Sequence, residues 1–134
     1  MFRLKDKISK EKANNINPIV LAFVGDAVYS LYIREKLAFS HDAKAHQLNK
    51  LATKSVKATA QAEFIKKIMP ILTEEEVAVY KRARNAKKTT RAKSATVAEY
   101  NMSTGFEALI GYLYVTGQEE RMDILLSEGN NNEN

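Results

Sequence analysis

Apolar residues recur every three or four positions along most of this chain, without the strict apolar and polar alternation of strands. Between 43 and 69, for example, Leu48, Leu51, Ile65 and Met69 fall on one helical face. Tracts rich in Ala, Leu, Lys and Glu, interrupted by few glycines or prolines, favour helix over strand. The hydrophobic pattern therefore predicts an all-α protein.

The same pattern, with its stop signals, places the predicted helices. They run from Pro18 to about Ala38, from Ala43 to about Met69 with room for an internal break, from a cap at Thr73 to about Ala83, from Val97 to about Thr116, and from Gln118 to about Ser127. Pro70 ends the second helix because proline cannot continue it, and Gly117 separates the last two. The C-terminal GNNNEN is polar and is expected to fray.

Side chains suited to capping helix N-termini precede several of these segments. Asn17 is expected to cap the first helix, with a proline in its first turn. Ser40 or Asp42 is expected to cap the second. Thr73 and Glu76 have the spacing of a capping box at the third, where each side chain bonds the other residue's backbone N–H.

Composition narrows the class of protein. With 134 residues, 45% hydrophobic and 28% charged, the chain is expected to form a single domain over 1–134, with its core at about 17–127. The absence of cysteine excludes disulfides, thiolate metal sites and cysteine nucleophiles. The longest apolar run, Ile19 to Val24, is too short to span a bilayer, so we expect a cytoplasmic protein with no membrane partner. The net charge of +5 suggests a nucleic-acid partner only weakly.

Two predicted helices are apolar nearly all round, and each carries one carboxylate. VLAFVGDAVYSLY contains Asp26 directly after Gly25, and STGFEALIGYLYV contains Glu107 near Gly111. A helix that is apolar on every side lies in the interior or in a subunit interface, where an ionised carboxylate needs a partner. The glycines would let the two helix backbones approach closely enough for the carboxylates to converge.

Two hypotheses explain these acids. Each could pair with a Lys or Arg, or lie at a solvated edge of its helix, in a structural role. Alternatively, the two carboxylates could bind Mg²⁺, which takes few protein ligands and keeps much of its hydration. Such an ion can activate water and stabilise charge that develops on a phosphate. The pattern alone leaves both hypotheses open.

AFVGDAVYSLYIR and STGFEALIGYLYV resemble, in order and separation, the two signature segments of the ribonuclease III family. Between them, residues 82–87 (RARNAK) are similar to a segment of its short bacterial branch, Mini-ribonuclease III, which lacks the double-stranded-RNA-binding domain of the longer enzymes. The resemblance covers roughly 17–114. It implies the ribonuclease III endonuclease-domain fold, a homodimer, and Mg²⁺-dependent cleavage of both strands of RNA duplexes. For the short branch it also suggests maturation of 23S ribosomal RNA precursor ends.

The resemblance further implies roles for individual residues. Asp26 and Glu107 correspond to catalytic, metal-binding acids of the family. The longer enzymes carry a glutamate where this chain has Ala22 and an aspartate where it has Thr104. Half of the acidic set is therefore missing, as in the short branch. Ser103 or Thr104 could orient a metal-bound water through its hydroxyl.

The segment 81–96 is rich in basic residues and has no acid, which indicates a helix end followed by an exposed loop. By charge alone it could be a solvated loop, but within this family we expect it to contact RNA phosphates with little base recognition. Lysines on the second helix form another patch, which could equally be a solvated face. The expected RNA-binding residues are Arg82, Arg84, Asn85, Lys87, Lys88, Arg91 and Lys93, with Lys50 and Lys54.

Aromatic residues at helical spacing on the two acidic helices are typical of core or interface packing; they are Tyr29, Tyr32, Tyr112 and Tyr114. The apolar face of the first helix exceeds what one small domain can bury, which supports a two-fold homodimer; this face comprises Val20, Phe23, Val24 and Val28. His41 and His46 lie away from the acidic segments, and His46 fits contact with RNA or solvent better than proton transfer.

Three classes of function are consistent with these features. The leading interpretation is a Mg²⁺-dependent endoribonuclease specific for double-stranded RNA. The alternative is a catalytically inactive double-stranded-RNA-binding protein of the same fold, which the presence of both Asp26 and Glu107 disfavours. The third is a helical protein-interaction module whose acids are structural.

Overall fold

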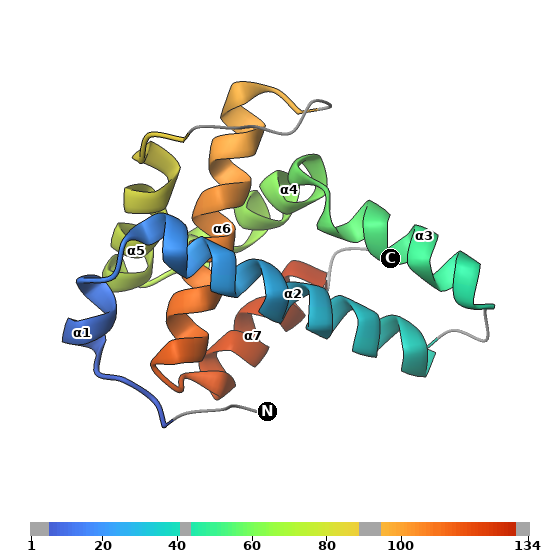
Figure 1. Cartoon of the computed structure of the whole chain (residues 1–134), viewed down its shortest axis with the longest axis horizontal. Coiled ribbons are helices and arrows are strands. Elements are labelled where there is room, and N and C mark those ends of the chain that lie inside the picture. The colour runs from blue at the N-terminus through green and yellow to red at the C-terminus, as the bar shows by residue number, and fades with distance from the viewer. Residues whose placement is uncertain (1–5, 41–43, 89–94, 131–134) are drawn as a thin grey trace.

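The computed structural model describes residues 6–40, 44–88 and 95–130, and all regular elements within them are helical (Figure 1). They are α1 (Lys10–Asn14), α2 (Pro18–Ser40), α3 (Ala45–Val56), α4 (Ala58–Ile68), the 3₁₀ turn η1 (Met69–Ile71), α5 (Glu74–Asn85), α6 (Val97–Val115) and α7 (Glu119–Asn130). The all-α prediction is confirmed. Within these residues no helix is both long and apolar enough to cross a membrane.

Several helix starts coincide with the predicted ones because local capping defines them. The Asn17 side chain accepts a hydrogen bond from the backbone N–H of Ile19 at 2.8 Å and so caps α2. Thr73 and Glu76 form the expected capping box at α5. The predicted second helix breaks at Lys57, whose extended backbone separates α3 from α4.

Other helix ends differ from the prediction. The N-cap of α3 is Lys44, because the backbone is still extended there. Ser40, one expected cap, is instead the last residue of α2, and Asp42, the other, lies outside the described residues. The hydrophobic pattern also missed the short α1, which begins after Ser9, whose hydroxyl accepts a hydrogen bond from the Lys12 backbone at 3.1 Å.

The last helix continues beyond its predicted end. Gly129, expected to fray, is buried against the ring of Phe64, where an added Cβ would lie 2.0 Å from a ring carbon. The next side chain, Asn130, donates a hydrogen bond to the Tyr32 hydroxyl at 2.8 Å. Tertiary contacts thus extend α7 into the polar tail, and residues 131–134 lie outside the described part.

The core is built around α6, which runs through the centre of the fold, while α2 crosses it (Figure 1). The helices α4, α5 and α7 also pack against α6. Its side chains Phe106, Leu109 and Leu113 are therefore completely buried. The predicted apolar character of α6 on all sides is explained by this central position.

The two apolar helices meet backbone to backbone. A Cβ on Gly25 of α2 would lie 1.7 Å from the carbonyl oxygen of Glu107. A Cβ on Gly111 of α6 would lie 2.0 Å from the carbonyl oxygen of Leu21. No other residue fits without separating the helices, so the close approach expected from the glycines is observed.

The tyrosines of the acidic helices pack within the protomer, as expected: Tyr29 and Tyr112 are buried, and Tyr32 and Tyr114 are half-buried against the core. Tyr29 meets Phe106 edge-on, with ring centroids 5.0 Å apart. It also meets Phe64 at 5.9 Å. These rings join α2, α4 and α6 beside the helix crossing.

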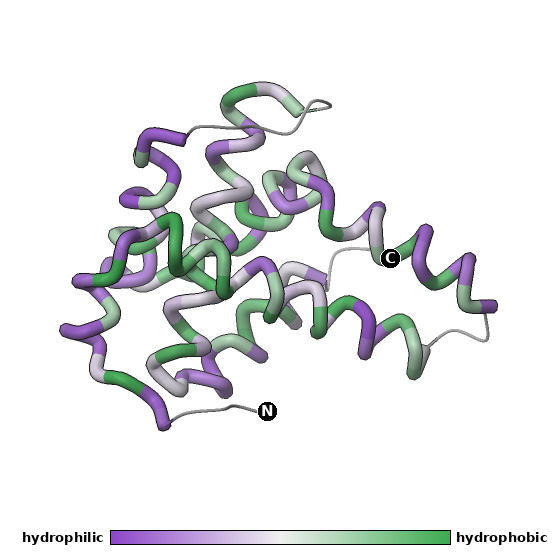
Figure 2. The backbone as a smooth tube through the Cα atoms, viewed as in Figure 1, coloured by the Kyte–Doolittle hydropathy of each residue, from purple (hydrophilic) through white to green (hydrophobic). Residues whose placement is uncertain are grey.

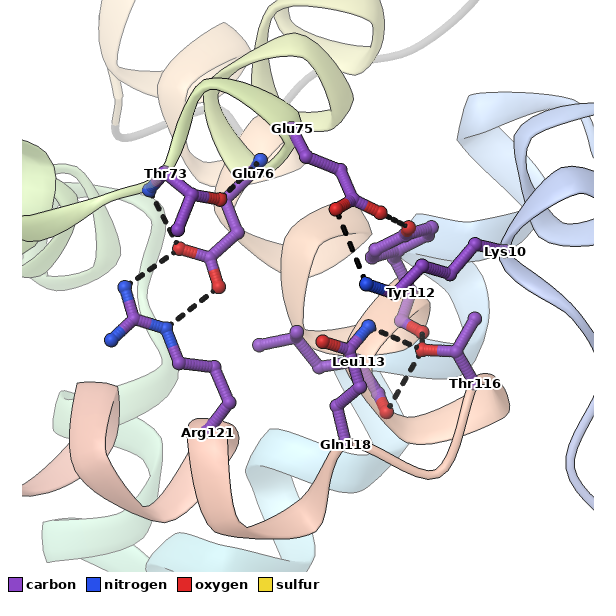
Figure 3. Close-up of polar contacts among 9 residues, drawn as sticks. All are labelled: Lys10, Thr73, Glu75, Glu76, Tyr112, Leu113, Thr116, Gln118 and Arg121. Atoms are coloured by element: carbon purple, nitrogen blue, oxygen red, sulfur yellow. Dashed lines mark hydrogen bonds and ion pairs between the residues drawn. The ribbon is translucent and has the colours of Figure 1, made fainter.

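Polar contacts attach the surrounding helices to one another (Figure 3). Arg121 of α7 donates two hydrogen bonds of 2.8 Å to the buried Glu76 of α5. Burial alone would raise the pKa of Glu76, but the hydrogen bonds and charge of Arg121, together with hydrogen bonds from Thr73, outweigh it and hold this pKa below its usual value. The Tyr112 hydroxyl donates to Glu75, which also pairs with Lys10 at 3.3 Å. These contacts join α1, α5 and α7 to one another and to α6, and so stabilise the helices around the crossing of α2 and α6.

Candidate active site

Asp26 of α2 and Glu107 of α6, far apart in sequence, lie next to each other in the fold. Their carboxyl groups are within hydrogen-bond reach of one another. This proximity follows from the helix crossing, because Gly25, directly before Asp26, packs on the backbone of Glu107. The structure thus brings together the two acids that the sequence pattern singled out.

The two acids differ in exposure. Glu107 is half-buried, whereas Asp26 is exposed. An interior position of Asp26 is not found within the protomer, because only one side of α2 packs against α6; the exposed Asp26 fits the other two expectations, a solvated helix edge or a subunit interface. The exposed aspartate leaves the pair accessible from solvent.

The surroundings of Glu107 disfavour its negative charge. Burial raises its pKa, and the hydrogen bond and charge of Asp26 raise it further, to about 8. The amide of Gln61 acts in the opposite direction and lowers this pKa. Within the described residues, the Glu107 carboxylate therefore lacks a nearby positive charge that would favour its ionised form.

Neither acid has a basic partner in the part of the chain that the structure describes. The ion pairs found there join Lys10 to Glu75, Lys66 to Glu63 and Arg121 to Glu76. Of the two structural alternatives, pairing of each acid with its own Lys or Arg is not observed among the described residues, whereas the exposed Asp26 fits a place at the solvated edge of its helix.

A divalent cation fits this pair of acids. Within ranges 6–40, 44–88 and 95–130, no group of three or more His, Cys, Asp and Glu residues could hold a metal ion. Ala22 and Thr104, where the resemblance would lead one to expect further acids, are both buried. Mg²⁺ is usually bound through one or two carboxylates and keeps several of its waters. Two neighbouring carboxyl groups at a position open to solvent meet both requirements, and a cation would also offset the repulsion between their negative charges.

Ser103 and Thr104 do not offer a hydroxyl hydrogen to this site. Both side chains are buried, and each donates to the backbone carbonyl of Tyr100 at 3.0 Å. Such bonds to the preceding turn are common for hydroxyl residues within helices. The hypothesis that one of these hydroxyls orients a metal-bound water therefore stays a prediction, with the hydroxyl oxygen as the acceptor.

Gln61 of α4 is a site residue that the sequence analysis missed. Its side chain is 1% exposed and its amide lies beside the Glu107 carboxyl. Its Nε2 nevertheless has no partner in hydrogen-bond geometry among the described residues. An unsatisfied buried donor costs about 1–3 kcal/mol. A glutamine on the otherwise apolar face of α4 is the signal that could have identified it.

Several predicted RNA-binding residues make contacts within the fold. Arg82 donates to the backbone and side-chain oxygens of Asn14, at 2.7 Å each. The Arg84 guanidinium stacks 5.5 Å from the Tyr80 ring centroid. Lys88 donates to two carbonyls at the end of α5, and burial lowers its pKa. Their expected role in phosphate binding stays a prediction, in competition with these contacts.

Other predicted RNA-binding residues are open to solvent. Lys50 and Lys54 are exposed one turn apart on α3 and line an open groove together with His46. Asn85 and Lys87 are exposed at the end of α5. The two remaining candidates, Arg91 and Lys93, lie outside the described residues, as does His41.

One face of α2 carries exposed apolar side chains. Phe23 is 79% exposed, and Val20 and Leu31, on the same face, are about half exposed. Figure 2 shows the apolar N-terminal half of α2 on the outside of the fold. Val28, predicted to belong to this face, is instead buried in the core, and Val24 packs partly against it.

Comparison with known proteins places these features in a family. The ribonuclease III domain matches residues 19–118. The chain is 42% identical over 126 residues to Mini-ribonuclease 3 of Clostridium tetani, covering 93% of this chain and 83% of that protein. It is 50% identical over 116 residues to Mini-ribonuclease 3 of Streptococcus pneumoniae, covering 85% and 91%. A crystal structure of a Fusobacterium nucleatum protein superposes with a TM-score of 0.77 at 35% identity, covering 84% of this chain and 90% of that one.

Proposed function

The chain belongs to the ribonuclease III family of endoribonucleases, and we propose on this basis that it cleaves double-stranded RNA with Mg²⁺ held by Asp26 and Glu107. The observation that supports the metal site is the contact between these two carboxyl groups, without a Lys or Arg partner among the described residues. We further propose that residues 1–134 form one catalytic domain with its core at about 17–127.

The chain's own residues define what the site does. Glu107, half-buried beside the crossing, is held in position by α6, while the exposed Asp26 borders the solvent from which RNA approaches. When bound, a divalent cation lowers the pKa of a coordinated water and offsets negative charge on the phosphate. The chain supplies the carboxylates that hold it, and its exposed lysines orient the duplex.

Removal of divalent cations should stop cleavage. We expect labelled duplex RNA to be cut in Mg²⁺ and to remain intact in EDTA, with activity restored when excess Mg²⁺ is added back. Single-stranded RNA of the same sequence serves as the control. Cleavage in EDTA, or binding of duplex without cleavage in Mg²⁺, would contradict the proposal.

Duplex RNA is proposed to contact the exposed lysines of α3 and the exposed end of α5. Lysines contact phosphates without reading bases, and each neutralised phosphate releases counterions. We expect the Lys50→Ala/Lys54→Ala double variant to bind duplex RNA more weakly and to reduce the slope of log K against log salt by roughly one per lysine. Filter binding at several salt concentrations measures this slope.

Lys66→Ala is the matched control for that prediction. Lys66 is also an exposed lysine, but it pairs with Glu63 on α4 at 3.2 Å. This variant should leave the salt slope unchanged. An unchanged slope in the α3 double variant would exclude α3 from the RNA surface.

The exposed face of α2 supports a homodimer. Phe23, Val20 and Leu31 form an apolar stripe that an isologous contact would bury. We expect light scattering to give twice the chain mass for the wild type and the monomer mass for Phe23→Glu. Because Phe23 contributes little to the protomer core, circular dichroism should stay unchanged.

Ile124→Glu on α7 is the control for this experiment, since Ile124 is a similarly large apolar residue that is 51% exposed. It should remain dimeric. A wild-type protein that is monomeric at micromolar concentration would contradict the dimer proposal.

The proposed natural substrate is the duplexed ends of the 23S ribosomal RNA precursor, cleaved in the cytoplasm. This part rests on the resemblance to the short branch of the family and on the names of the relatives. Cells that lack the protein should accumulate precursor with extended ends, detected by primer extension. Normal ends in such cells would exclude this substrate.

A further inference from the structure

A third helix contributes a polar side chain to the pair of acids. Gln61 projects from α4, which packs against α6, and its amide lies beside the Glu107 carboxyl. At 1% exposure it is among the most completely buried side chains of the protein. Its neighbours on the buried face of α4 are apolar: Ala62, Phe64, Ile65 and Ile68.

The Gln61 amide is not explained by packing. Its Nε2 has no hydrogen-bond partner within the described part of the chain. A donor buried in this way destabilises the folded protein, and an apolar side chain of similar size would avoid that cost. A buried donor without a well-aligned protein partner beside the Glu107 carboxyl points to a role in the site rather than in packing.

We propose that Gln61 is a positioning residue of the active site: its Nε2 donates to the Glu107 carboxylate and orients it to hold a divalent cation with Asp26. This inference rests on the proposed metal site. In this structure Glu107 interacts with Asp26, and the Gln61 amide lies beside Glu107 without a hydrogen bond of good geometry from its Nε2. A divalent cation held by Asp26 and Glu107 would offset their negative charge, and the Glu107 carboxylate could then accept a well-aligned hydrogen bond from Gln61 Nε2.

Groups that hold a metal ligand by a hydrogen bond fix its orientation, and their removal typically weakens metal binding by about 10- to 100-fold. The test replaces Gln61 by methionine or leucine, which have similar volumes and no donor. Binding of Mn²⁺, used as the probe in place of Mg²⁺, is measured by electron paramagnetic resonance without RNA. Thermal unfolding is measured in EDTA.

We expect both variants to bind Mn²⁺ with a dissociation constant raised by about 10- to 100-fold. Their unfolding temperature in EDTA should equal or exceed that of the wild type, because an unpaired donor has been removed. At saturating Mg²⁺, the KM for duplex RNA should stay unchanged. A purely structural glutamine would give the opposite pattern: lower stability and unchanged metal affinity.

Thr116→Val is the matched control. Thr116 is also a buried polar side chain, but it bonds to the Tyr112 carbonyl at the far end of α6, at 2.7 Å. This variant should lose stability in EDTA and keep the Mn²⁺ affinity of the wild type.

The inference is overturned if both Gln61 variants bind Mn²⁺ within threefold of the wild type, or if neither folds in EDTA. Failure of the proposed function gives a different result, because then the wild type itself would not bind Mn²⁺, or Asp26→Asn would not change that binding.

Discussion

We expect Asp26→Asn to cleave duplex RNA about a thousandfold more slowly than the wild type, while folding normally. A cation at the reacting phosphate contributes several kcal/mol to transition-state stabilisation, and about 4 kcal/mol corresponds to a factor of about a thousand in rate. Asparagine keeps the size of the side chain but lacks the charge, so it leaves Glu107 as the sole carboxylate of the pair. Asp26 is exposed, so its substitution should change the free energy of unfolding little.

Single-turnover cleavage in saturating Mg²⁺ measures this rate, and urea denaturation checks the fold. Glu107→Gln should show a similar loss. Asp123→Asn is the control, because Asp123 is an exposed aspartate on α7, a different helix from those that carry the two acids. If Asp26→Asn retained more than a tenth of the wild-type rate, Asp26 would not be a catalytic ligand.

The second large effect is expected at the helix crossing. Gly25→Ala should destabilise the protein by about 3 kcal/mol or more, because the new methyl group would lie 1.7 Å from a backbone oxygen that cannot move alone. In an ordinary helix the same substitution stabilises by roughly 0.5–1 kcal/mol. The sign of the effect therefore reports directly on the contact between α2 and α6.

Urea denaturation followed by circular dichroism measures this change. Ala78→Gly, at an exposed position of α5, controls for helix propensity and should cost only about 0.5–1 kcal/mol. Any Gly25→Ala protein that remains folded should also lose cleavage, because the widened crossing separates Asp26 from Glu107. A stabilised and fully active Gly25→Ala variant would contradict the observed packing.

Much of the secondary structure could be predicted from local signals. Asn17 and the box of Thr73 with Glu76 act within one turn, so their hydrogen bonds are encoded in a few consecutive residues. The prediction failed where distant contacts act on the chain. Gly129 looked like part of a frayed tail, yet the Phe64 ring packs on it and α7 continues.

The candidate site was predicted in part. Asp26 and Glu107 stood out as single charges in apolar helices, and the adjacent glycines indicated how these helices meet. Nothing local indicated that Gln61 would face Glu107, since that depends on where α4 packs. Nor did the sequence reveal that Arg82 would be held by Asn14.

Helix periodicity, caps and lone acids are properties of short segments, and the chain's order of residues was enough to identify them. Which groups share one site is a different question, because it depends on how whole helices pack and on which atoms that packing leaves exposed or unpaired. The crossing of α2 and α6 at Gly25 and Gly111 answers it here: it joins two carboxylates, places the buried amide of Gln61 beside Glu107, and leaves Asp26 open to solvent.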